Sequence, residues 1–63
     1  MAMVLVRFVR QDGSDVWINR DRVAAVWPDG RGSQIAVEGT GEWYAVVESV
    51  GVVVDRLHGA MTK

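Results

Sequence analysis

DVWINRDRVAAVWPDG, residues 15–30, contains two apolar runs separated by a polar break, and this arrangement decides the fold. In the first run, Trp17 lies between Val16 and Ile18 and is expected to point away from them, with the period of two typical of a strand. The second run, VAAVWP, is rich in the β-branched and aromatic residues that favour strands. Between the runs, the Asn19 side chain can accept a hydrogen bond from a backbone amide two or three residues further on. The stretch therefore predicts two short strands joined by an Asx-turn or one short helical turn.

The sequence before this stretch predicts a strand that pairs with residues 15–19. Residues 3–10, MVLVRFVR, alternate with a period of two and are rich in valine. The pair Asp12-Gly13 follows, and it favours a tight turn because glycine tolerates a positive φ and aspartate can bond to its own backbone. We therefore expect a β-hairpin at the N-terminal end of the domain.

The sequence after this stretch predicts two more strands. Pro28 is expected to end the third strand, because proline lacks the amide proton that a sheet requires. Two further alternating runs then follow, SQIAVEG at residues 33–39 and EWYAVV at residues 42–47. Glycine-containing turns precede both runs, so each is expected to pair with the strand before it.

The last segment, ESVGVVVDRLHGAMTK, is compatible with a helix or a strand. Its valines and Gly51 favour a strand, since glycine costs a helix about 1 kcal/mol relative to alanine. Ser49 is a good N-cap and Gly59 suits a C-terminal cap. Apolar residues repeat at helical spacing along one side: Val50, Val53, Val54 and Leu57. We expect a short helix that packs on one face of the sheet, with a strand as the alternative.

These segments predict one small domain over residues 1–63, with an ordered core at about residues 4–58. Its fold class is mainly β (α+β): a five-stranded antiparallel meander or small open barrel with a short C-terminal helix. The tails, Met1–Ala2 and Ala60–Lys63, are expected to be flexible. A core this small rarely supplies more than about 3–5 kcal/mol without a disulfide, a metal or a partner subunit.

Composition narrows the choice among these sources of stability. The chain has no cysteine and one histidine, which excludes disulfides, thiolate chemistry and metal sites built from several histidines of one subunit. We therefore expect a homo-oligomer, with no metal and no cofactor. The formal net charge of −1 gives no case for a membrane surface, and the apolar runs are too short to span one. The N-terminus lacks the pattern of a signal peptide, and a cytoplasmic location is expected.

The order of these segments resembles the small FlbD-type flagellar and swarming motility proteins. The resemblance covers about residues 4–57, and the chain departs from the pattern in its arginine-rich NRDR segment and in Gly51. The resemblance implies a bacterial cytoplasmic accessory protein without catalytic residues. The positions that match are Gly13, Trp17, Ile18, Asn19, Val23, Val26, Gly41, Tyr44, Val46, Val47, Glu48, Ser49, Val53 and Leu57.

Catalysis is not expected from these residues. His58 is the single histidine, and no serine or threonine lies in the strand-to-helix turn that activates a nucleophile. The carboxylates of Glu38, Glu42 and Glu48 are interpreted as a solvated strand face rather than as an acid–base pair. The glycine-rich loops DGRGS and EGTGE connect strands and do not open a helix, so they are not phosphate-binding loops. The protein is therefore predicted not to be an enzyme.

The three tryptophans are the candidates for an interaction surface. By parity, Trp27 is expected to share a face with Val23, and Trp43 with Val47. One side of a small sheet cannot bury three tryptophans and thirteen valines, so at least one indole is expected at a subunit or partner contact. The predicted interface residues are Trp17, then Trp43, with Val9, Val53 and Leu57.

An alternative function is a small oligomeric RNA- or DNA-binding regulator. Arginines gather in the first half of the chain, and Arg7 can lie near Trp17 if both point to the outer face. An arginine beside an aromatic ring suits single-stranded nucleic acids, through phosphate contact and base stacking. The candidate residues are Arg7, Arg20, Arg22 and Trp17. The preferred prediction remains a non-enzymatic homo-oligomeric binding or assembly module, with a motility-related role implied by the resemblance.

Overall fold

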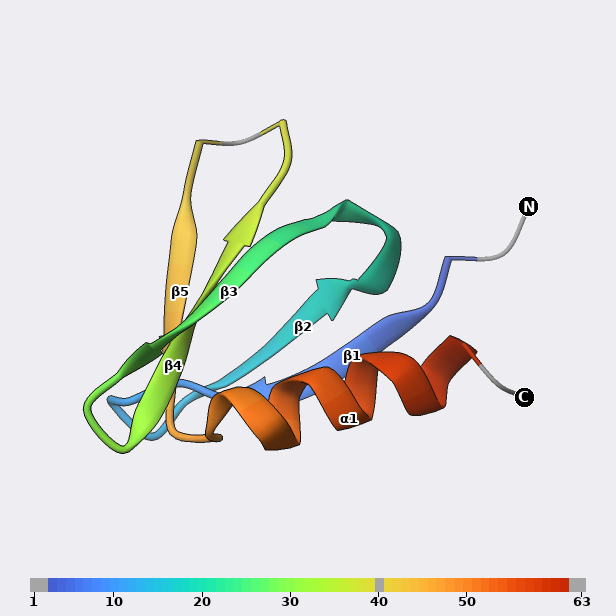
Figure 1. Cartoon of the computed structure of the whole chain (residues 1–63). Coiled ribbons are helices and arrows are strands. Elements are labelled where there is room, and N and C mark those ends of the chain that lie inside the picture. The colour runs from blue at the N-terminus through green and yellow to red at the C-terminus, as the bar shows by residue number, and fades with distance from the viewer. Residues whose placement is uncertain (1–2, 40, 62–63) are drawn as a thin grey trace.

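The computed structural model describes residues 3–39 and 41–61, so the flexible ends predicted at residues 1–2 and 62–63 lie outside it. Figure 1 shows α1 running alongside β1, with the β3–β5 sheet at one end of the molecule. The elements in chain order are β1 (Leu5–Val9), β2 (Asp15–Asn19), the 3-10 turn η1 (Arg20–Arg22), β3 (Val23–Asp29), β4 (Gly32–Val37), β5 (Trp43–Val46) and α1 (Val50–Met61).

The five strands form two antiparallel sheets, one of β1 and β2 and the other of β3, β4 and β5. A single bridge, Arg10 to Val46, joins the sheets, and the Val47 N–H donates to the Val9 carbonyl at 2.8 Å beside it. The spatial order is therefore β2-β1-β5-β4-β3. The predicted α+β class is confirmed, whereas the strands do not close into a barrel. The predicted meander is broken between β2 and β3, which are consecutive in the chain but are not paired.

Local turn chemistry acts as predicted at both ends of β2. Before it, Gly13 has a φ of 95°, and both the backbone N–H and the hydroxyl of Ser14 donate to Asp12 Oδ1. After it, Asn19 Oδ1 accepts a hydrogen bond from the Asp21 N–H at 3.0 Å and starts η1. These two contacts fix the hairpin and the short helical turn that joins the sheets.

Pro28 does not end β3, which continues to Asp29. Pro28 is the register partner of Ser33 on β4. β3 is the outer strand of its sheet, and strands at a sheet edge tolerate proline because only one side of the backbone is paired. The predicted strand end at Pro28 is therefore wrong.

The core lies between the sheets and α1. Its fully or almost fully buried apolar side chains come from four strands and the helix, and half-buried valines, Tyr44 and Leu57 pack against them. Because every second side chain of a strand turns inward to this core, apolar and polar residues alternate along the strand sequences. The buried apolar residues in the described part are Phe8, Ile18, Ile35, Val46 and Val53.

α1 confirms the predicted helix over the alternative strand. Ser49 Oγ accepts a hydrogen bond from the Val52 N–H at 3.4 Å, as an N-cap does. The helix continues to Met61, so it does not end at the cap that was predicted at Gly59. A glycine costs a helix about 1 kcal/mol, which is too little to end one that is held by packing.

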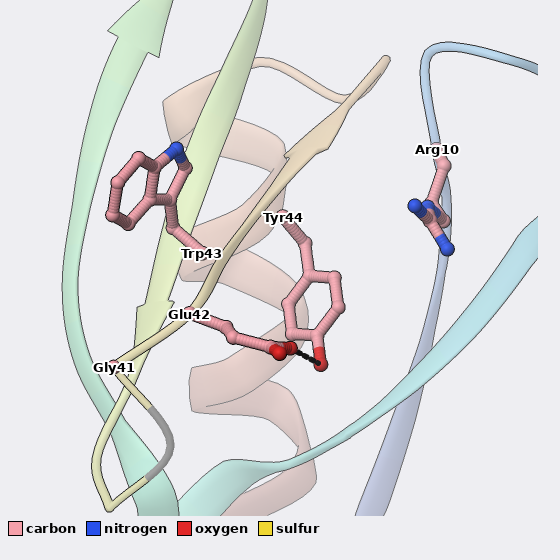
Figure 2. A pocket seen from close by; sticks show the side chains of 5 residues that line it. All are labelled: Arg10, Gly41, Glu42, Trp43 and Tyr44. Carbon is pink, nitrogen blue, oxygen red and sulfur yellow. Dashed lines mark hydrogen bonds between the residues drawn. The ribbon is translucent and has the colours of Figure 1, made fainter.

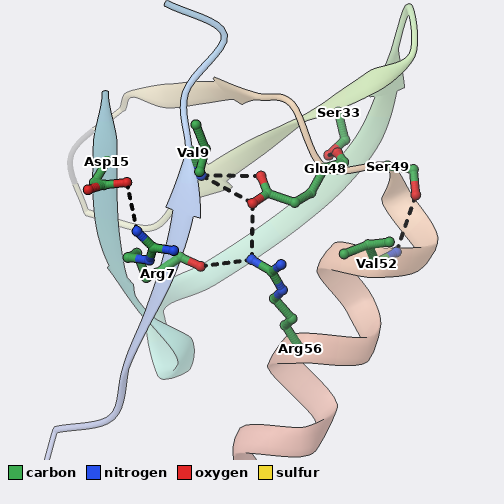
Figure 3. A network of polar contacts seen from close by, with 8 residues as sticks. All are labelled: Arg7, Val9, Asp15, Ser33, Glu48, Ser49, Val52 and Arg56. Carbon is green, nitrogen blue, oxygen red and sulfur yellow. Dashed lines mark hydrogen bonds and ion pairs between the residues drawn. The ribbon is translucent and has the colours of Figure 1, made fainter. Parts of the chain in front are cut away.

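A buried carboxylate links α1 to β1 (Figure 3). The side chain of Glu48 is 8% exposed, and both its oxygens accept from the Val9 N–H at 3.2 Å. Arg56 Nη1 donates to Glu48 at 3.0 Å and to the Arg7 carbonyl at 3.2 Å, while Ser33 Oγ donates to the Glu48 carbonyl at 2.8 Å. Glu48 is therefore a structural residue, and its interpretation as part of a solvated strand face is wrong.

Candidate functional site

Large apolar side chains lie on the surface of this chain more often than in its core. Among the described residues, eight are exposed, compared with five that are buried. Tryptophan is prominent in the exposed set: Trp17 is 56% exposed, Trp27 38% and Trp43 61%. The other exposed members are Met3, Leu5, Val47, Val52 and Val54.

Two of the tryptophans share the outer face of the three-stranded sheet, which points away from α1. Ile35 and Val46 point inward to the core, so their neighbours along β4 and β5 point outward. Figure 2 shows Trp43 and Tyr44 on opposite sides of β5 accordingly. The register places six outward residues in two rows across the strands, Ala25–Ala36–Trp43 and Trp27–Gln34–Ala45. We call these six residues the tryptophan face.

The tryptophan face carries no formal charge. Four of its residues are alanine or glutamine, and two are tryptophan. The amide of Gln34 is held in place, because its Nε2 donates to Asp29 Oδ2 at 3.0 Å. Interface cores are depleted in charged residues and enriched in tryptophan, so this composition is typical of a protein contact surface.

A bulge in β3 brings Trp27 to this face. The register shifts between Val23 and Ala25, so Val23 turns to the core side while Ala25 and Trp27 turn outward. The prediction that Trp27 shares a face with Val23 is therefore wrong. Trp27 was not among the predicted interface residues, and the sequence carries no clear signal for the bulge that turns it outward.

The outer face of the β1–β2 sheet has a different chemistry. Arg7 and Trp17 are direct register partners, which confirms the prediction that they lie near each other. Arg7 Nη1 forms an ion pair with Asp15 Oδ1 at 3.0 Å on the same sheet. This face therefore combines two exposed apolar side chains, Trp17 and Leu5, with a neutralised charge pair.

The predicted interface residues do not form one patch. Trp43 lies on the tryptophan face, and Val9 lies half-buried at the bridge between the sheets. Leu57 lies elsewhere, in a groove of about 270 Å³ on the helix side that it lines with Arg20, Val23, Val54 and His58. Val53 is 0% exposed and belongs to the core, so its assignment to an interface is wrong.

The predicted nucleic-acid residues are also separated. Arg20 lines the groove beside Leu57 and pairs with Asp21 at 3.4 Å. The Arg22 guanidinium lies beside Gly39 in the β4–β5 connection. Arg7 alone lies on the same face as Trp17, so the structure does not gather the three arginines around that indole.

A shallow cavity of about 310 Å³ lies along the start of β5 (Figure 2). Arg10 lies 5.8 Å from the centre of the Tyr44 ring, and the Tyr44 hydroxyl donates to Glu42 at 3.4 Å. The described side chains include no cluster of three or more His, Cys, Asp or Glu residues that could hold a metal ion. These contacts stabilise the surface and do not assemble a nucleophile with a base.

The hairpin turn before β2 changes the pKa of a carboxyl group. The hydrogen bond from the Ser14 hydroxyl lowers the pKa of the exposed Asp12 below its ordinary value of 3.8, and the Ser14 N–H adds to this effect. These hydrogen bonds stabilise the hairpin turn, and Asp12 lines a surface hollow together with Trp43 and Ala45. In residues 3–39 and 41–61, no helix has the length and apolar character needed to cross a membrane.

Comparison of the chain with protein-family models, curated proteins and solved structures gives no match. The resemblance to FlbD-type proteins therefore stays a prediction.

Proposed function

We propose that the protein is a small non-enzymatic assembly module that forms a homo-oligomer by burying the tryptophan face. The observation that carries this proposal is a group of six uncharged residues with two exposed indoles on one sheet face, beside the Asp29 carboxylate that holds Gln34, on a chain whose core is small. Burial of apolar surface is the main driving force for association, and tryptophan is the residue most enriched at binding hot spots.

The two indoles supply part of the free energy that a specific contact needs. Each exposed indole offers on the order of 100 Å² of apolar surface to a partner. Burying two indoles per copy then contributes on the order of 5 kcal/mol per copy, at about 25 cal/mol per Å². Part of this gain offsets the rotational and translational freedom lost on association, so we expect a concentration-dependent equilibrium.

A non-enzymatic role is supported by how the polar side chains are used. Glu48 holds β1 and α1 together, and Asp29 accepts from the amides of Gln34 and Gln11. These groups are engaged in structural contacts instead of facing an enclosed pocket. The resemblance to FlbD-type proteins would make this module a motility-related accessory protein of a bacterial cytoplasm.

Nucleic-acid binding is the second candidate, and one observation favours it. Arg7 lies directly opposite Trp17, a pairing that suits base stacking and phosphate contact. Asp15 already pairs with Arg7, and Arg20 and Arg22 lie elsewhere, so the assembly role is preferred.

Native mass spectrometry across protein concentrations, with and without total RNA, tests the proposal. The wild-type chain is expected to form oligomers, and Trp43→Lys is expected to shift the population to monomer by placing a charge on the tryptophan face. Trp17→Lys is the matched control, because this exposed indole lies on the other sheet. A monomer at all concentrations would overturn the proposal, and so would a Trp43→Lys protein that still assembles. An RNA adduct that weakens steeply with salt would favour the second candidate.

A further inference from the structure

The tryptophan face has a two-fold pattern of large and small side chains. Trp27 and Trp43 occupy two opposite corners, Ala25 and Ala45 occupy the other two, and β4 runs between them. A surface with bulky side chains at two corners and space at the other two can pack against a copy of itself. This requires that each indole meets an alanine of the second copy.

We infer that two copies pack face to face about a two-fold axis that runs along β4, an inference that rests on the proposed homo-oligomer. In any face-to-face pair of identical surfaces, the two-fold axis lies in the plane of contact. An axis along β4 exchanges the sides occupied by β3 and β5. Trp43 then lies over Ala25 of the second copy, and Trp27 lies over Ala45 of the second copy.

This arrangement is compatible with the packing of two sheets. Face-to-face sheets lie about 10 Å apart with their strands within about 30° of each other, and the inner side chains interdigitate. An indole fills this distance where the facing residue is alanine. A two-fold axis that placed indole over indole at one corner would place alanine over alanine at another corner. The facing alanines would leave a void, and voids in a contact lower its stability.

Hydrogen bonding of the Gln34 side-chain amide favours an axis along β4 over an axis across the strands. An axis across β4 also places indoles over alanines, but it buries the Gln34 amide against Ala36 of the second copy. Asp29 still accepts from one N–H of that amide, but its second N–H and its carbonyl oxygen would be buried without a partner, and an unsatisfied polar group costs about 1–3 kcal/mol. The axis along β4 instead brings the two Gln34 amides together, where each can donate its second N–H to the other's carbonyl oxygen while Asp29 keeps the first.

Exchange of a large and a small side chain tests this axis. Trp43→Ala and Ala25→Trp are each expected to raise the dimer dissociation constant at least about tenfold, the first by loss of contact and the second by a clash. The double variant Ala25→Trp/Trp43→Ala restores the match across the axis, so its dissociation constant is expected within about threefold of wild type. Sedimentation equilibrium measures all four constants, and circular dichroism verifies the fold.

The control is the double variant Ala45→Trp/Trp43→Ala, which restores the match only for an axis across the strands. The inferred axis is overturned if this control recovers while Ala25→Trp/Trp43→Ala does not, or if neither double variant recovers. In both cases the proposed homo-oligomer still stands, provided that wild type assembles and Trp43→Lys does not. If the wild-type protein is a monomer, both the proposed function and the inferred axis are wrong.

Discussion

Glu48, which directly precedes the N-cap of α1, forms a 3.0 Å ion pair with Arg56 in the second turn of the helix. The same carboxylate accepts from the backbone N–H of Val9, which is 39 positions earlier in the chain. The Arg56 guanidinium also lies 5.9 Å from the centre of the buried Phe8 ring. This pair therefore fixes the position of the helix on β1.

Glu48→Ala is expected to lower the free energy of unfolding by about 1–3 kcal/mol, because the half-buried Val9 N–H loses its acceptor. Arg56→Ala is expected to cost less than Glu48→Ala, on the order of 1 kcal/mol, since the Arg56 side chain is 46% exposed and the Val9 N–H keeps its acceptor. Glu38→Ala, at an exposed position, is the control and should stay within about 0.5 kcal/mol of wild type. Urea unfolding followed by tryptophan fluorescence measures these values. Equal stability of Glu48→Ala and Glu38→Ala would contradict the structural role of Glu48.

Gly32→Ala is expected to destabilise the fold by more than about 2 kcal/mol. A methyl group on Gly32 would collide with the Val46 carbonyl oxygen, and backbone atoms at this sheet contact cannot move away cheaply. Gly51→Ala is the matched control, since a methyl group there meets nothing within 4 Å and lies in α1. This variant should gain about 0.5–1 kcal/mol from higher helix propensity. Thermal unfolding should therefore move in opposite directions for the two substitutions, and a shared direction would contradict this account.

Ser14→Ala is expected to weaken the acid resistance of the hairpin turn. Because the folded pKa of Asp12 lies below its ordinary value of 3.8, the stabilisation is fully present above that pH. It is lost as the pH falls through the folded pKa. Removing the hydroxyl should raise the Asp12 pKa part of the way back, since the backbone N–H at position 14 still donates. An NMR titration of the Asp12 carboxyl measures this shift, and an unchanged pKa would rule out the hydroxyl as its main cause.

Arg7→Ala/Arg22→Ala is expected to leave the oligomer mass unchanged. Both arginines lie off the tryptophan face, and the exposed Arg7–Asp15 pair contributes about 0–1 kcal/mol to stability. Native mass spectrometry under the conditions used for Trp43→Lys provides the comparison. Dissociation of this double variant to monomers would place the subunit contact on the β1–β2 face instead.

The elements of this fold are predictable from the sequence because their causes are local. Period-two alternation, the Asp12-Gly13 turn and the Asn19 side chain each act within a few residues. The Ser49 cap and the valine stripe likewise predict α1, although valine propensity left a strand as the alternative. Strand ends were less certain, as Pro28 shows, because an edge position is a property of the assembled sheet.

The sequence by itself determined which segments form strands and helix, and that the chain carries more large apolar side chains than one core can bury. Only the tertiary structure decided which of them remain exposed. The bulge after Val23 reversed the parity of β3, and Val53 and Glu48 became buried through contacts with residues far away in the chain. The physical reason is that burial depends on which distant segments meet, whereas hydrogen-bonded turns and side-chain alternation depend on neighbours.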